Sequence, residues 1–92
     1  MAGVERREFE FTEENFRRLF QERYRYLEIV ETSRTSGKMR RKKVWTINFN
    51  TFWRNLKKYS DYDIFRYDVS RRKITLVLTD KDNVVSISLS KL

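Results

Sequence analysis

The chain contains no cysteine, no histidine and no proline, and only two glycines, among its 92 residues. Without cysteine there is no disulfide framework, no thiolate nucleophile and no cysteine-ligated zinc. Without histidine the commonest general base and metal ligand are also missing. The composition therefore argues against an enzyme, and we predict no catalytic residues, no metal site, no cofactor and no small-molecule substrate.

Long apolar runs are also absent. The first residues, MAGVERREFEF, are charged where a signal peptide would need an apolar stretch. No segment approaches the roughly 18 apolar residues that a membrane span requires. We therefore expect an intracellular protein, cytoplasmic or nuclear and not secreted, with no membrane partner.

Acidic residues are missing from one third of the chain. The net charge is +8, and residues 32–60 carry nine cations and no acid. The other residues carry 12 cations and 13 acids, so this third holds the whole excess. A concentrated excess of this kind is typical of a surface that contacts a polyanion.

A chain of this length forms one small core, and 39% hydrophobic and 15% aromatic residues suffice to build it. No internal repeat and no proline- or glycine-rich linker divides it. We predict a single domain over residues 1–92, with residues 1–8 as a flexible N-terminal arm.

Two helices are predicted. Thr12 is suited to cap a helix whose first turn holds Glu13 and Glu14, and Phe11 and Phe16 fall at the spacing of a hydrophobic staple. Asn50 or Thr51 can cap a second helix. Its inward residues would be Phe52, Trp53, Leu56 and Tyr59, and its outward residues Arg54, Lys57 and Lys58.

Five strands are predicted. Residues 26–32 fit either a strand or a continuation of the first helix, and their β-branched residues favour the strand. Residues 44–49 alternate, with Trp45, Ile47 and Phe49 on one face, and would pair with residues 26–32 as a hairpin. Alternating runs at 65–69, 74–78 and 85–89 predict an antiparallel meander. The order α-β-β-α-β-β-β predicts an α+β fold, with both helices on one face of an antiparallel sheet.

The segment TSRTSGKMRRKK, residues 32–43, would then be a basic hairpin loop that binds phosphates or enters the major groove as a β-ribbon. Two simpler interpretations compete with this one: a solvated turn, and a nuclear localisation signal, which KMRRKK resembles in composition. The predicted nucleic-acid-binding residues are Arg34, Lys38, Arg40, Arg41, Lys42, Lys43, Arg54, Lys57 and Lys58, with Arg71, Arg72 and Lys73 as an auxiliary group around a turn.

Aromatic side chains follow the basic segment, and Trp45, Phe49, Phe52 and Trp53 lie close together in the sequence. Bases could stack on any that are exposed. Their spacing favours burial of most of them in the core. The close acidic pairs Asp61 with Asp63 and Asp80 with Asp82 could hold magnesium in a nuclease, but the second pair sits in a turn sequence that favours Asp for backbone reasons.

The leading hypothesis is a small non-enzymatic nucleic-acid-binding protein, with DNA slightly favoured over RNA. The alternative is a regulatory module that docks its basic face on an acidic partner protein. The last run, VVSISLS, carries no charge and would form an uncovered edge strand, through which a homodimer could assemble.

Overall fold

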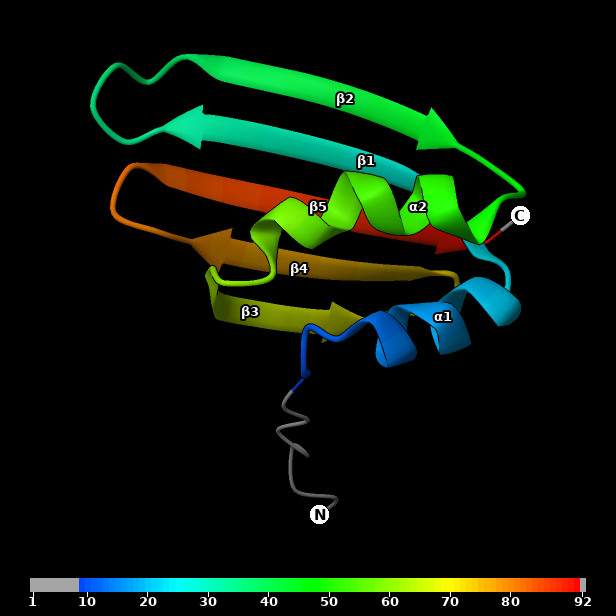
Figure 1. Ribbon diagram of the computed structural model, residues 1–92. Helices are drawn as coiled ribbons and strands as arrows, with labels where there is room; N and C mark the ends of the chain where they lie inside the picture. Colours follow the sequence, from blue (N-terminus) through cyan, green and yellow to red (C-terminus); the bar gives the residue numbers. More distant parts are fainter. Residues whose placement is uncertain (1–8, 92) are drawn as a thin grey trace.

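The computed structural model describes residues 9–91 and has the predicted order of elements (Figure 1). The elements are α1 (Glu13–Gln21), β1 (Tyr24–Ser33), β2 (Met39–Trp45), α2 (Phe49–Leu56), the 3₁₀ helix η1 (Lys57–Tyr59), β3 (Asp63–Val69), β4 (Lys73–Thr79) and β5 (Asn83–Lys91). The α+β prediction is confirmed, and residues 26–32 are strand. The predicted arm of residues 1–8 lies outside the described residues.

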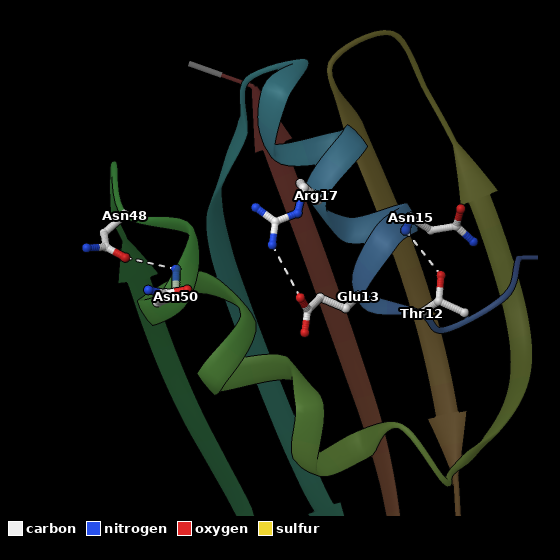
Figure 2. Close-up of polar contacts among 6 residues, drawn as sticks. All are labelled: Thr12, Glu13, Asn15, Arg17, Asn48 and Asn50. Atoms are coloured by element: carbon white, nitrogen blue, oxygen red, sulfur yellow. Dashed lines mark hydrogen bonds and ion pairs between the residues drawn. The ribbon is translucent and has the colours of Figure 1, made fainter.

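The start of α1 follows the sequence signals closely. The hydroxyl of Thr12 accepts a hydrogen bond from the backbone N–H of Asn15 at 3.1 Å, as Figure 2 shows. The rings of Phe11 and Phe16 lie edge to face, with centroids 4.7 Å apart, so the predicted staple is formed. Arg17 reaches back one turn to Glu13 at 3.2 Å.

The second helix begins earlier than predicted. Asn48, and not Asn50 or Thr51, is the cap. Its side-chain oxygen accepts a hydrogen bond from the backbone N–H of Asn50 at 2.8 Å (Figure 2) and another from that of Thr51 at 3.3 Å. Phe49 therefore belongs to α2 and packs against Phe20 of α1 at 5.7 Å between ring centroids. The prediction that Phe49 ends a strand is wrong, since β2 stops at Trp45.

The five strands form one antiparallel sheet in the order β2-β1-β5-β4-β3. The predicted meander is present as β3, β4 and β5. However, β5 lies in the centre of the sheet between β1 and β4, so the prediction that residues 84–90 form an uncovered edge is wrong (Figure 1). The two edge strands are β2 and β3, and any pairing of copies through an edge would use one of these.

Both helices cover the same face of the sheet (Figure 1). The core between them contains Phe16, Leu19 and Phe20 from α1, Phe52 and Leu56 from α2, Tyr59 from η1, Tyr24, Leu27 and Ile29 from β1, and the inward residues of β4 and β5. Within residues 9–91, the opposite face of the sheet is left uncovered by any helix. Among the same residues, no helix has the length and apolar character needed to cross a membrane.

One strand departs from simple alternation. The register of β3 against β4 shifts between Ile64 and Arg66, so Phe65 is an extra residue in a β-bulge. Ile64 and Tyr67 contact the core, whereas Phe65 is 69% exposed. In the alternating run at 65–69, the bulge therefore separates Phe65 from the core-facing Tyr67. Val69, at the end of β3, is 53% exposed.

Candidate functional site

The basic segment is an edge strand and not a loop. The turn between β1 and β2 occupies residues 34–38 and is closed by the bond from Ser33 N–H to the Lys38 carbonyl, at 2.9 Å. Gly37 has a φ of 72°, in the left-handed region that glycine adopts without strain. Arg40, Arg41, Lys42 and Lys43 follow inside β2 and are all exposed. The predicted hairpin is present, but its loop is shorter than predicted.

The hairpin is also not a separate two-stranded ribbon. β1 pairs with β5 along its length, from Tyr24 opposite Lys91 to Ser33 opposite Asn83. The major groove of DNA is about 12 Å wide and admits a two-stranded ribbon. This hairpin instead forms one side of a five-stranded sheet that has helices on one face. The hairpin is therefore part of a wider sheet, whereas the sequence suggested a separate two-stranded ribbon.

The four cations of β2 divide between the two faces of the sheet. Val44 lies opposite the buried Leu27, and Lys43 lies opposite Glu28. Directly opposed residues share a face and successive residues alternate. Arg40 and Lys42 therefore lie on the helix side, whereas Arg41, Lys43 and Trp45 lie on the uncovered side, which we call the open face.

On the open face one acid faces two cations. The Glu28 carboxylate lies 3.7 Å from Arg41 Nε and 4.0 Å from Lys43 Nζ. All three side chains are substantially exposed, and such long ion pairs at a surface contribute little, typically ~0–1 kcal/mol. The cations therefore stay available to an external anion.

On the helix side, Glu31 lies among cations as Glu28 does on the open face. It lies opposite Arg40, 3.4 Å from Lys58 Nζ, and it accepts a hydrogen bond from the Tyr59 hydroxyl. This hydrogen bond, with the attraction of Lys58 and Arg40, holds the pKa of Glu31 below its ordinary 4.5. Burial, and then the adjacent carboxylate, raise the pKa of Tyr59. Glu31 is therefore ionised at neutral pH, and Arg40, Lys42 and Lys58 outnumber it.

The remaining predicted cations are exposed but more scattered. Arg34 holds two turns together, because its guanidinium donates to the Asp80 carbonyl at 3.0 Å and its backbone N–H donates to Asp82 at 2.9 Å. Lys38 lines a shallow depression of about 340 Å³ with Glu31, Ser33, Ser36, Arg40 and Asn83. Arg54 and Lys57 are exposed on α2 and η1.

The auxiliary basic group lies near the other end of the sheet. Arg71 and Arg72 are in the β3–β4 turn, and Lys73 begins β4 opposite Ser90. Tyr26 also lies opposite Ser90, and Trp45 lies opposite Tyr26, so Lys73 and Trp45 belong to one row across the open face. The structure thus aligns one auxiliary cation with the exposed tryptophan.

Some aromatic residues near the basic segment are buried and others are exposed, and the sequence predicted this division only in part. Phe52 is buried, and Phe49 and Trp53 pack against the core, as expected. Trp45 is 55% exposed on the open face, so it is the exception to the expected burial of most of these residues. Tyr26, which pairs with Trp45, and Phe65 on β3 were not predicted as candidates. The pairing of β1 with β2 places Tyr26 on this face and the bulge in β3 exposes Phe65, and neither feature can be read from the sequence.

Asp80, of the second acidic pair, has a structural role in a turn. The Asp80 carboxylate accepts hydrogen bonds from the backbone of Asp82 and Asn83, at 2.8 and 2.7 Å, and so closes the β4–β5 turn. These backbone bonds lower the pKa of Asp80. Within residues 9–91, no three potential metal ligands of the His, Cys, Asp or Glu type come together.

Comparison with models of protein families, with curated proteins and with solved structures finds no match.

Proposed function

We propose that this protein binds nucleic acid, without catalysis, through the cationic edge strand β2. The observation that carries the proposal is the run Arg40, Arg41, Lys42 and Lys43, which is exposed along one edge of the sheet. Arg and Lys side chains supply most phosphate contacts in nucleic-acid complexes. Arg54, Lys57 and Lys58 extend the positive surface over the helix side.

A charged edge also has a simpler explanation. Lysine-rich edge strands prevent unwanted pairing between sheets, and this role needs no ligand. The two explanations differ in what they require: protection from pairing needs charge of either sign, whereas phosphate binding needs positive charge and produces a strong dependence on salt.

The test is a titration of labelled single-stranded DNA, duplex DNA and duplex RNA at two salt concentrations. If about five phosphates of a duplex are neutralised, log K falls with log salt at a slope of roughly −4.5. Replacing all four β2 cations by Thr, which favours strands, should abolish most of the binding. A control with Arg17, Arg18, Arg23 and Lys81 replaced by Gln removes the same charge elsewhere and should bind nearly as wild type.

Equal weak binding by both variants and the wild type, with no salt dependence, would sink the proposal. One feature favours a second function in that event. β2 is an edge strand with one side of its backbone unpaired by any described strand, so an acidic extended segment of a partner protein could add to the sheet there. A partner that is retained from nuclease-treated lysate by wild type, and lost by the four-Thr variant, would support that function.

A further inference from the structure

The open face carries an arrangement that the charge of β2 alone does not explain. Trp45 is 55% exposed, and Tyr26, its direct cross-strand neighbour, is half-buried. Directly opposed side chains have Cβ atoms roughly 5 Å apart. Among residues 9–91, neither ring is engaged in stacking with another aromatic ring, since the ring pairs formed by Phe9, Phe11, Phe16 and their neighbours all lie on the helix side.

Cations accompany these rings along the same strand. Lys43 and Arg41 are two and four residues before Trp45, so they lie on the same face at intervals of roughly 6.7 Å. Among residues 9–91, Glu28 is the one acid that forms ion pairs with them, at 4.0 Å from Lys43 and 3.7 Å from Arg41. An exposed indole beside a short row of cations combines a stacking surface with a phosphate contact.

Short side chains, several of them polar, line the middle of the open face. Ser86, Ser88 and Ser90 of β5 lie on it beside Thr75 and Thr79 of β4, all of them only partly buried. Their hydroxyls can donate or accept hydrogen bonds, and Val30 and Val77 lie beside Ser86 on the same face. On the far edge strand, Phe65 offers a second exposed ring. The five strands span roughly 19 Å from β2 to β3, and the bulge at Phe65 lies level with Arg41, four residues along β2 from Trp45.

We propose that this face binds single-stranded nucleic acid, with a base stacked on Trp45 beside Tyr26 and the adjoining phosphates next to Arg41 and Lys43. The inference rests on the proposed function and names its ligand. In a duplex the base faces are already stacked on one another, so an exposed indole is useful only to an unpaired base. Stacking does not select between deoxyribose and ribose, so DNA and RNA single strands share the required chemistry.

The experiment uses fluorescein-labelled oligo-dT and oligo-U of about 12 nucleotides, within the range of known single-strand sites, and a duplex of equal length. Binding is measured for wild type, Trp45→Ala, Trp45→Phe and Ile47→Ala. Ile47 is a matched control, because it is an apolar residue that is 70% exposed just beyond β2. Trp45→Ala should weaken single-strand binding about 5- to 150-fold, Trp45→Phe should restore most of it, and Ile47→Ala should leave it unchanged.

The two faces of β2 are compared with a second pair of variants. Arg41→Thr with Lys43→Thr acts on the open face, and Arg40→Thr with Lys42→Thr removes equal charge from the helix side. The open-face variant should bind more weakly and lower the salt slope by about 1.4 for a single strand. In a Trp53→Phe background, Trp45 is the only tryptophan left, and its emission should be quenched by the oligonucleotide.

The outcomes separate the two proposals. If Trp45→Ala binds as wild type, or if the duplex is preferred, or if only the helix-side variant loses binding, the open-face inference is overturned while nucleic-acid binding by β2 stands. If wild type binds none of the three probes, both proposals are overturned. A preference between oligo-dT and oligo-U identifies which single strand the face accepts.

Discussion

The hydroxyl of Tyr59 donates a hydrogen bond to the carboxylate of Glu31, and this bond joins η1 to β1 across 28 residues of sequence. Tyr59 is buried, and Glu31 lies between it and the exposed ammonium of Lys58. The pair fixes the end of the helical layer over the sheet, on the side where Arg40 lies. Loss of this hydrogen bond should therefore change the position of the basic side chains on the helix side.

Glu31→Gln should destabilise the fold in a way that depends on pH. The folded state holds the pKa of Glu31 below 4.5, so its ionised form contributes stability above about pH 4.5. That contribution is lost as pH falls through the lowered pKa. Wild type should exceed the variant by about 1 kcal/mol at pH 7, a value reduced for partial exposure, and the difference should shrink in acid. Urea unfolding at several pH values measures it.

A double-mutant cycle with Tyr59→Phe identifies the partner. If the hydrogen bond carries the effect, the two substitutions together should cost clearly less than the sum of each alone. Strict additivity would show that Glu31 acts through Lys58 and Arg40 instead.

Phe16→Ala should be among the most damaging single changes. Phe16 is fully buried and its ring meets those of Phe9, Phe11, Phe52 and Trp53. Removing it leaves a cavity where both helices meet, at a cost of about 3–5 kcal/mol in the free energy of unfolding. Phe65→Ala, the same change at a side chain that is 69% exposed, should cost less than about 0.5 kcal/mol. Similar losses at both positions would contradict the packing described.

Asn48→Ala should cost about 1 kcal/mol, because its side chain caps two backbone N–H groups at the start of α2. Asn48→Asp keeps the acceptor and should retain most of the stability. Asn50 lies next to the cap and only donates its backbone N–H to it, so Asn50→Ala is the matched control and should change the thermal midpoint far less.

Two positions with left-handed backbone should respond in opposite directions. Gly37 has a φ of 72° and open space around its Cα, so Gly37→Ala should cost about 1 kcal/mol through backbone strain alone. Arg23 has a φ of 76° between α1 and β1, and Arg23→Gly should remove strain and stabilise the fold by up to about 1 kcal/mol. Chemical denaturation of the two variants beside wild type measures both signs.

Local signals predicted the elements well. The cap at Thr12, the inward residues of β4 and β5 and the polar turns between strands depend on residues close in sequence, and each is present. The place of β5 could not be predicted in this way. Alternation shows which side chains of a strand are buried but not which strands flank it, and the long-range pairing with β1 decides that.

The sequence predicted which basic residues form the candidate site, but not the faces of the sheet on which they lie. Arg40 to Lys43 contain no apolar residue, so the sequence shows no alternation there and the strand was interpreted as a loop. The inward residue of β2 is Val44, opposite Leu27, and a shift of one residue moves every side chain to the other face. The sequence pattern therefore does not show that Trp45 is exposed, as it is in the structure.

The charge of β2 should also control self-association. Replacing Arg40, Arg41, Lys42 and Lys43 by Thr leaves a long, uncharged, β-prone edge with an unpaired row of backbone groups, which favours pairing with another copy. We expect the apparent mass of this variant in light scattering to rise with concentration, while wild type stays constant. The variant with Arg17, Arg18, Arg23 and Lys81 replaced by Gln has the same net charge and an intact edge, so it should behave as wild type. Association of both variants would show that net charge, and not the edge, keeps copies apart. Because an associated edge also hides the candidate site, nucleic-acid titrations of the four-Thr variant must be made below the concentration at which it associates.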